Sequence, residues 1–236
     1  MDISRRSYRA ELLDQPGIPL DAIERNMKEL DVINTYLGGH RITLSGFRKL
    51  IGNRKKVWVC EIGCGGGDNL LYLESWCKRH QITLKLTGID INPHCLFVAQ
   101  SKLAASGADL IRSDYRLVSF DQGQRPDIIF SSLFCHHFTD DQLVDMLQWM
   151  GTYSKTGFFI NDLHRHRLAY YSISLLTRAF SRSYLVKHDA PLSVLRGFTR
   201  GEWQAILRGA RLGTAEIHWK WAFRWLITVD TKQHTA

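Results

Sequence analysis

Long apolar runs are missing from this chain of 236 residues. No stretch reaches the roughly 18 consecutive apolar residues that a membrane span needs, and no apolar segment of a secretory signal follows the charged N-terminus. Both absences predict a cytoplasmic protein without a transmembrane segment. Internal repeats and low-complexity tracts are missing as well, while 44% of the residues are hydrophobic. This composition favours a single folded domain over residues 1–236.

Cysteine is scarce, and its spacing matches no common pairing motif. The five cysteines are an odd number, and no two of them form a Cys-x-x-Cys pair. Neither a disulfide framework nor a thiolate zinc site is therefore indicated. We expect five reduced, buried thiols at Cys60, Cys64, Cys77, Cys95 and Cys135.

Acidic residues are scarce at the two ends of the chain. Lys and Arg outnumber Asp and Glu by 11 to 7 in residues 1–56 and by 12 to 4 in residues 163–236, whereas residues 57–162 hold 8 against 12. Basic flanks can attract nucleic acid, anionic lipid or an acidic substrate, but arginines scattered over helices more often form a solvated face. We adopt the second interpretation and expect no nucleic-acid partner.

A glycine-rich turn follows the first predicted strand, residues 57–62. Gly63, Gly65, Gly66 and Gly67 come almost without interruption. Glycine lets the backbone turn sharply and approach a ligand closely, with its amide groups exposed. A dinucleotide fingerprint, Gly-x-Gly-x-x-Gly, would need a third glycine where Asp68 stands. The turn therefore does not fit a nicotinamide cofactor, and a bend without a ligand is the remaining simple alternative.

Three acidic residues stand at the carboxyl ends of successive predicted strands. Glu61 closes the first strand, Asp90 the second (residues 84–90) and Asp114 follows the third (residues 108–112). Ligands of open α/β sheets bind at this edge, where a carboxylate can accept hydrogen bonds from a ribose diol. Asp90 is our candidate for that contact.

The phrase Glu61-x-Gly63-x-Gly65-x-Gly67 resembles the first motif of the S-adenosylmethionine-dependent methyltransferases with a Rossmann-like fold. The resemblance implies an α/β fold with a seven-stranded, mostly parallel sheet and an antiparallel edge hairpin. It also implies a division of the single domain into four parts. These are a helical lid (1–56), a cofactor-binding core (57–162), a helical insertion after the fifth strand that roofs the substrate (163–198), and a closing helix with two strands (199–236).

The resemblance also assigns contacts to the cofactor S-adenosyl-L-methionine. Glu61 and the loop would hold its methionine end, Asp90 its ribose, and Asp114 its adenine, because Ser113-Asp114-Tyr115 resembles the third motif of the family. Ile91 would flank the adenine, and the backbone near Ser131 would meet its amino group. The expected cofactor-binding residues are Glu61, Gly63, Cys64, Gly65, Gly67, Asn69, Asp90, Ile91, Asp114, Tyr115, Ser131 and His136.

After the fourth predicted strand (residues 126–133) comes Phe134-Cys135-His136-His137-Phe138. A His-His-Phe segment before a helix is typical of ubiquinone/menaquinone-type and related methyltransferases. Enzymes that methylate exocyclic amines of nucleic-acid bases usually carry an Asn/Asp-Pro-Pro-aromatic motif there, which is absent. The segment argues for a small-molecule acceptor.

The fifth predicted strand runs into Asp162-Leu163-His164-Arg165-His166, which resembles methyltransferases of aromatic and polyketide biosynthesis. If the backbone stays extended, Asp162, His164 and His166 share one face. Structural histidines and a metal site are alternatives, but metal-dependent methyltransferases use mainly carboxylate and amide ligands, so we expect no metal. A histidine can take a phenolic proton near neutral pH. The catalytic candidates are His137, His164 and His166.

Residues 168–198 carry an apolar helical stripe that ends at Pro191. We expect it to roof a phenolic or lipophilic substrate, with membrane-surface association as a weaker alternative given the nearby arginines. The stripe consists of Leu168, Tyr171, Leu175, Leu176 and Phe180.

These expectations predict methylation of a hydroxyl on a small aromatic or polyketide-like molecule. Methylation of carbon, a cofactor-binding subunit without turnover, and an RNA or protein methyltransferase are the open alternatives. The sequence leaves a homodimer open.

Overall fold

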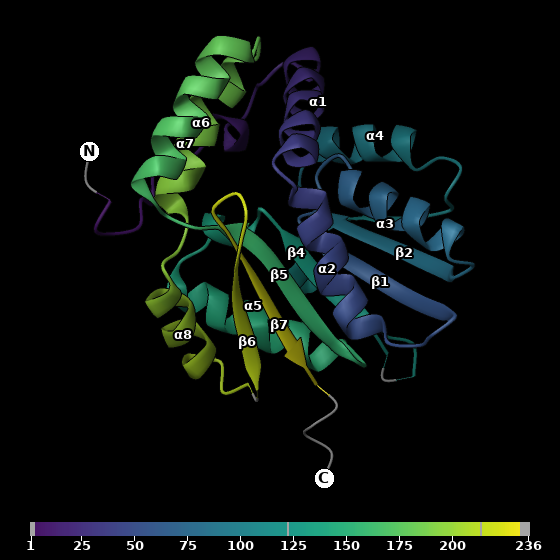
Figure 1. Ribbon diagram of the computed structural model, residues 1–236. Helices are drawn as coiled ribbons and strands as arrows, with labels where there is room; N and C mark the ends of the chain where they lie inside the picture. Colours follow the sequence, from purple (N-terminus) through teal and green to yellow (C-terminus); the bar gives the residue numbers. More distant parts are fainter. Residues whose placement is uncertain (1–2, 122, 213, 232–236) are drawn as a thin grey trace.

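Seven strands form one sheet in this protein, whose computed structural model describes residues 3–121, 123–212 and 214–231. The strand order is β3-β2-β1-β4-β5-β7-β6; β1 to β5 are parallel, and β7 pairs antiparallel with β5 and β6 (Figure 1). The predicted fold class, including the antiparallel edge hairpin, is confirmed. The strands are β1 (Lys56–Ile62), β2 (Thr83–Asp90), β3 (Asp109–Arg112), β4 (Ile128–Ser132), β5 (Gly157–Leu163), β6 (Ala215–Lys220) and β7 (Arg224–Asp230).

Central strands of this sheet are buried on both faces. Their sequences are therefore continuous apolar runs, as parallel strands covered by helices require. In β1, Val59 and Ile62 are fully buried, and Ile62 pairs in register with Ile89 of β2 and Ser131 of β4. Because the parallel strands are aligned in this way, their carboxyl ends meet at one edge of the sheet.

Helices cover both faces of the sheet (Figure 1). On one face, Phe47 of α2 and Leu70 of α3 pack in one cluster with β1; on the other, Leu147 of α5 and Trp203 of α8 pack with β4 and β7. None of the helices within the described ranges has the length and apolar character needed to cross a membrane. The helices are α1 (Leu20–Tyr36), α2 (Gly39–Ile51), α3 (Asp68–Arg79), α4 (Pro93–Lys102), α5 (Asp140–Tyr153), α6 (Arg167–Phe180), α7 (Tyr184–Arg196) and α8 (Arg200–Gly209).

Two helix boundaries differ from those that the sequence predicts. The residues before the first strand predict a short second helix over about residues 43–51, but α2 begins at Gly39, because Gly38 adopts a left-handed conformation (φ +77°) and turns the chain directly into the next helix. Pro191 was expected to end its segment, but it lies inside α7. The buried Leu185, Leu192 and Val194 hold α7 in place despite the lost backbone hydrogen bond.

Helices α6 and α7 project as a pair beyond the carboxyl ends of the strands (Figure 1). They pack on each other through Ala169 and Ile173 of α6 and Val194 of α7. The pair α6–α7 therefore forms one wall above the edge at which the parallel strands end. Of the predicted segments, residues 1–2 of the lid and residues 232–236 of the closing segment lie outside the described residues.

The contact between α2 and the sheet depends on a glycine. A Cβ added to Gly46 would lie 2.6 Å from the Phe159 ring, whereas a Cβ on Gly201, in the first turn of α8, would meet open space. We expect Gly46→Ala to lower the free energy of unfolding by about 1–3 kcal/mol through overpacking. Gly201→Ala, the matched control, should be neutral or stabilising by up to about 1 kcal/mol. Urea unfolding of both variants tests this, and equal stabilities would contradict the close packing.

Candidate functional site

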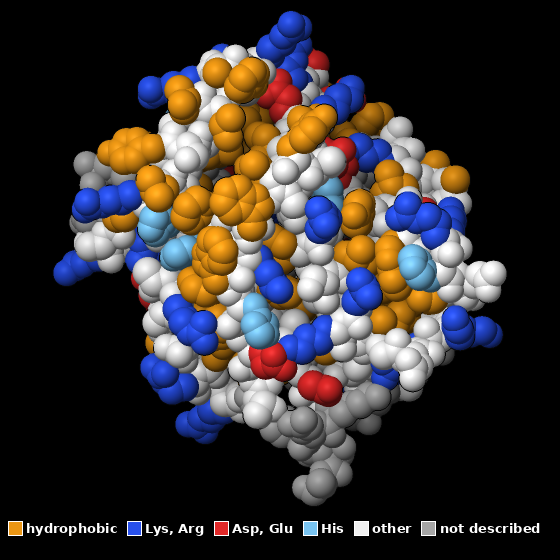
Figure 2. Space-filling view, viewed as in Figure 1, with side chains coloured by type: hydrophobic (Ala, Val, Ile, Leu, Met, Phe, Trp, Pro, Cys, Tyr) orange, Lys and Arg blue, Asp and Glu red, His pale blue; other side chains and the backbone are white. Residues whose placement is uncertain are grey.

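A cavity of about 1100 Å³ lies at the carboxyl ends of the parallel strands. A pocket for one drug-sized ligand measures about 300–1,000 Å³, so this cavity has room for two small molecules. Its walls are the glycine loop, the ends of β2 and β4, the N-terminal segment 11–18, and the helices α1, α6 and α7. Hydrophobic side chains gather on the molecular surface over α6 and towards α1 (Figure 2).

The glycine loop between β1 and α3 can be built only with glycine. Gly63, Gly65 and Gly67 all have positive φ, at +67°, +51° and +77°. A Cβ at Gly63 would lie 2.3 Å from the Phe134 ring, and one at Gly67 would lie 2.8 Å from Leu103. The loop therefore lies tightly against its neighbours at Gly63 and Gly67, whereas Gly65 is required by its backbone conformation rather than by lack of space. The loop lines the cavity through Gly63, Cys64, Gly65 and Gly66.

Glu61 at the end of β1 has an unpaired carboxylate oxygen facing this cavity wall. Its Oε1 accepts a hydrogen bond of 3.0 Å from Asn69 Nδ2, and Asn69 Oδ1 lies 2.9 Å from His40 Nδ1. Its Oε2 has no partner among the described residues although Glu61 is 1% exposed, and burial raises the pKa of the carboxyl. A buried polar atom without a partner costs free energy, so this oxygen suits a ligand that donates a hydrogen bond.

Asp90 at the end of β2 ties two loops together. Its Oδ2 accepts a hydrogen bond of 2.8 Å from the amide of Gly65, and its Oδ1 accepts one of 2.8 Å from the amide of Asn92. Burial raises the pKa of Asp90, and those amide bonds oppose the rise. Asp90 and its neighbour Ile91 both line the cavity, and Ile91 is exposed.

Of the other residues predicted to contact the cofactor, some line the cavity and some are buried in the core. Asp114 lines the cavity, and its ion pair with Arg116 lowers the pKa of its carboxyl. Tyr115 also borders the cavity, but its ring is buried against Phe138 and Trp149. Ser131 does not line the cavity. Its hydroxyl is fully buried, 3.6 Å from the thiol of Cys135, and the cavity wall at the end of β4 includes Ser132, Leu133 and Phe134 instead.

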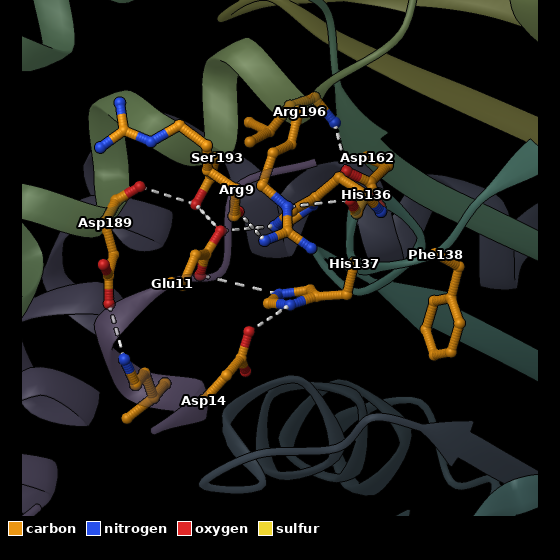
Figure 3. Close-up of polar contacts among 12 residues, drawn as sticks. Arg9, Glu11, Asp14, His136, His137, Phe138, Asp162, Asp189, Ser193 and Arg196 are labelled. Atoms are coloured by element: carbon orange, nitrogen blue, oxygen red, sulfur yellow. Dashed lines mark hydrogen bonds and ion pairs between the residues drawn. The ribbon is translucent and has the colours of Figure 1, made fainter. Parts of the chain in front are cut away.

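Two histidines and three carboxylates form a network beside the cavity (Figure 3). His136 Nδ1 lies 2.8 Å from Asp162 Oδ1, and its Nε2 lies 3.5 Å from Glu11 Oε1. His137 Nδ1 lies 3.2 Å from Asp14 Oδ2, and its Nε2 lies 3.7 Å from Glu11 Oε2. Glu11 thus bridges both histidines and fastens the N-terminal segment to the core.

Charge in this network is set by burial and pairing together. Burial alone would lower the pKa of His136, but the charge and hydrogen bond of Asp162, and then those of Glu11, raise it to about 9. The same pairing outweighs burial and lowers the pKa of Glu11 to about 2 and that of Asp162 below its usual range. His136 therefore carries a proton at neutral pH. The side chains of Glu11, His136 and His137 place atoms that can ligate a metal within 4.8 Å of one another. Within the described ranges, no other group of three His, Cys, Asp or Glu side chains does so.

The N-terminal segment was expected only as a general cover, and its side-chain contacts were missed. Asp189 of α7 accepts hydrogen bonds of 2.8 and 3.0 Å from the amides of Leu12 and Leu13. Arg196 Nε donates to the carbonyl of His136 at 3.1 Å. No local pattern around Glu11 or Asp14 marks them in the sequence, because their partners lie more than 120 residues away.

Comparison with known proteins agrees with this geometry. Residues 59–157 match a protein family described as a methyltransferase domain, and they contain the glycine loop, Asp90 and both network histidines. Residues 59–157 therefore form a methyltransferase domain, and the sheet around them has the Rossmann-like methyltransferase fold. Comparison with curated protein sequences gives no match. The more specific resemblance to quinone or polyketide enzymes stays a prediction.

Solved structures share the methyltransferase fold at low sequence identity. The plantazolicin methyltransferase BpumL in complex with S-adenosylhomocysteine has a TM-score of 0.63 and 16% identity, over 89% of this chain and 88% of that one. A SAM-dependent methyltransferase from Aquifex aeolicus has a TM-score of 0.61 and 17% identity, over 91% of this chain and 100% of that one. An O-methyltransferase family 2 protein from Planctomyces limnophilus, in complex with apigenin, has a TM-score of 0.63 and 14% identity, over 92% of this chain and 63% of that one.

The cofactor of this methyltransferase is S-adenosylmethionine, and the residues of the loop region fit it. The unpaired Oε2 of Glu61 suits an ammonium group, and the tight glycine loop leaves the cavity open where a side chain would fill it. Asp90 presents a carboxylate to the same cavity. The individual cofactor contacts predicted from the sequence remain predictions.

Two of the three catalytic candidates in this methyltransferase lie outside the cavity. Neither His164 nor His166 lines it, whereas His137 does. His164 Nδ1 accepts a hydrogen bond of 3.2 Å from the Trp219 indole, and burial lowers its pKa to about 4, which makes it a weak base. His166 caps the start of α6. The structure thus places neither His164 nor His166 on the cavity wall, because Asp162 turns inward to His136 and the chain then bends into α6.

Proposed function

We propose that this methyltransferase transfers the methyl group of S-adenosylmethionine to a hydroxyl of a small aromatic acceptor. The observation that carries the proposal is one shared cavity. It is lined by Glu61 and Asp90, the residues predicted to contact the cofactor, and also by Glu11 and His137 of the histidine network. Much of its remaining wall is apolar, which suits an aromatic ring. The apolar part includes Ile18, Ile33, Leu37, Leu163, Ile173, Val194 and Phe223.

Each group has a distinct part in this reaction. S-Adenosylmethionine, when bound, supplies an electrophilic methyl group on a sulfonium sulfur. His137, whose side chain is more exposed than that of His136, can take the proton that leaves the acceptor hydroxyl. The carboxylates of Glu11 and Asp14 then stabilise the imidazolium. Holding the oxygen in line with the sulfonium supplies a further part of the rate.

Cover over the cavity favours a small acceptor over RNA or protein. The 3₁₀ turn Leu12–Asp14 is fixed to α7 through Asp189, and residues 13–18 line the cavity beside α1. A polymer would have to displace this segment, whereas a small molecule fits beneath it. The solved relative in complex with apigenin supports this size class of acceptor.

His137→Gln should lower turnover about 10²- to 10⁴-fold, because the acceptor proton loses its base. Affinity for S-adenosylhomocysteine should stay unchanged, since His137 belongs to the acceptor side. His80→Gln is the control, because His80 lies on α3's outer end, stacked on Trp76. Single-turnover assays with isotopically labelled cofactor measure both variants. Full activity of His137→Gln would exclude His137 as the proton acceptor.

The test of the proposed function is transfer of labelled methyl to a panel of phenols, with the product identified by NMR. The proposal predicts a new O-methyl resonance. A new C-methyl resonance would assign the reaction to carbon. Tight binding of S-adenosylhomocysteine without transfer to any small acceptor would favour a non-catalytic or macromolecule-directed protein.

A further inference from the structure

The outer face of α6 is apolar although no part of the described chain covers it. Leu175 is 71% exposed and Phe180 is 82% exposed, while the opposite face, Ala169, Ile173 and Thr177, is buried against the protein. A helix that is apolar on both sides is normally buried on both sides. Exposed apolar patches of this kind mark interaction sites. The outer face consists of Leu168, Tyr171, Leu175, Leu176 and Phe180, and Tyr184 of α7 extends it.

Charges within the segment that carries this face are all basic, and the nearest carboxylate, Glu29 of α1, is already engaged by the amides of Arg182 and Ser183. Residues 167–188 contain four exposed basic side chains and no Asp or Glu. None of these four forms an ion pair within the described ranges. The four are Arg167, Arg178, Arg182 and Lys187. The face is therefore suited to a partner that is apolar inside and anionic at its surface.

This face adjoins the cavity. Leu176 is part of the outer face and also lines the cavity, together with Ile173 from the next turn of α6. Trp221, at the turn between β6 and β7, is 68% exposed and lines the cavity as well. Orange side chains gather over α6 and towards α1 on this side of the molecule (Figure 2). A molecule on the outer face of α6 therefore has an apolar path into the cavity.

We infer that α6 docks the enzyme on an anionic lipid bilayer and that the acceptor is an amphiphile taken from it. The leucines and aromatic rings would enter the headgroup boundary, and the four basic side chains would contact anionic headgroups. The polar aromatic head of the acceptor lies beside Glu11 and His137, and its apolar chain extends past Ile173 and Leu176. This identity of the acceptor rests on the proposed function, whereas the docking does not.

A second copy of the chain is the other occupant with the right chemistry, and charge argues against it. A two-fold dimer would place the same patch on both sides of the interface. Arg178, Arg182 and their two basic neighbours would then face the same groups without any carboxylate from residues 167–188 to pair with. An anionic bilayer meets both properties of the face, and a second copy meets only its apolar character.

Sedimentation with lipid vesicles tests the docking. Full-length protein is mixed with sucrose-loaded vesicles of phosphatidylglycerol and phosphatidylcholine in equal parts, or of phosphatidylcholine alone. We expect binding to the anionic vesicles that falls with salt. The double variant Leu175→Ser/Phe180→Ser should bind more than about tenfold more weakly, and Arg178→Gln/Arg182→Gln about 30-fold more weakly. Leu117→Ser is the matched control, since Leu117 is 81% exposed in the turn after β3.

Each outcome is decisive for the docking. Unchanged affinity of every variant for S-adenosylhomocysteine shows that the cavity is intact, so a loss of vesicle binding belongs to the surface. Equal binding to both vesicle types, binding to neither, or equal loss by Leu117→Ser would overturn the proposal. Light scattering that shows a dimer dissociated by Leu175→Ser/Phe180→Ser would assign the face to a second copy. Vesicle binding without any methyl transfer would leave the docking intact and refute the proposed function.

The acceptor class has its own test. Two phenols that differ only in alkyl chain length are offered in anionic vesicles to wild type and to Leu176→Asp. We expect the wild type to prefer the long-chain phenol and Leu176→Asp to lose that preference, measured as the ratio of the two kcat/KM values, because a charged side chain would lie where the alkyl chain passes. A preference for the short-chain phenol in the wild type would overturn the amphiphile assignment.

Discussion

Asp90→Ala should weaken binding of S-adenosylhomocysteine about 100-fold. A hydrogen bond to a charged group contributes about 1.5–3 kcal/mol, and this carboxylate is the group expected to accept from the ribose. The variant also leaves the amides of Gly65 and Asn92 without their acceptor, so the glycine loop loses its link to β2. Isothermal titration calorimetry measures the dissociation constant.

The control for Asp90 is another aspartate of the same sheet. Asp109→Ala removes an exposed carboxylate at the start of β3, where it pairs with Lys85. That end of the strand is opposite the cavity edge, so cofactor affinity should not change. Comparable weakening by both substitutions would mean that Asp90 acts through general stability rather than through the cofactor.

Asp162→Asn should destabilise the fold by about 3–5 kcal/mol, because it leaves the charged His136 buried with one partner fewer. Asp162 is fully buried and lies 2.8 Å from His136 Nδ1. For a chain of this size the melting temperature should fall by about 6–20 °C. Glu216→Gln, which removes an exposed partner of Lys49, should cost less than about 1 kcal/mol. Thermal unfolding monitored by circular dichroism measures both variants, and equal melting temperatures would contradict a charged network.

The same network predicts how stability depends on pH. The folded-state pKa of His136 is raised to about 9, so its contribution is complete below its ordinary pKa of about 6.5 and is lost as pH rises through about 9. The loss amounts to about 3 kcal/mol. Glu11 and Asp162 have lowered pKa values, so their contributions are complete above their ordinary pKa values and are lost as pH falls.

Urea unfolding of the wild type between about pH 6.5 and 9.5 should therefore show decreasing stability, and Asp162→Asn should show a shallower decrease. A wild-type stability that does not fall over this range would mean that His136 is neutral in the folded protein.

Local sequence was sufficient for the fold and for the cofactor side of the site. The glycine loop, Asp90 and the strand ends follow one another within a short stretch of chain, and parallel strands bring their carboxyl ends to one edge. Glu61, Gly63 and Asp90 could therefore be placed together before any coordinates. The capping box Thr199–Glu202 at the start of α8 is likewise a local signal, and it is present in the structure.

The acceptor side depends on contacts between distant segments. Glu11 meets His136, 125 positions further along the chain, and Asp189 of α7 holds the turn at Leu12. Alternation along β5 suggested that Asp162 and His164 face the same way, but the strand ends at Leu163 and the pattern ends with it. The stripe on α6 was expected to roof the substrate, yet most of it faces outward. Periodicity gives the faces of a helix without showing which face meets the protein.

Calorimetric titration of the wild-type protein with S-adenosylhomocysteine, and separately with NADH, tests the central claim most directly. The account predicts micromolar binding of the sulfur ligand at one site per chain, lost in Asp90→Ala, and no binding of NADH. No heat from S-adenosylhomocysteine, or equal binding by Asp90→Ala, would contradict the assignment of this cavity to the cofactor.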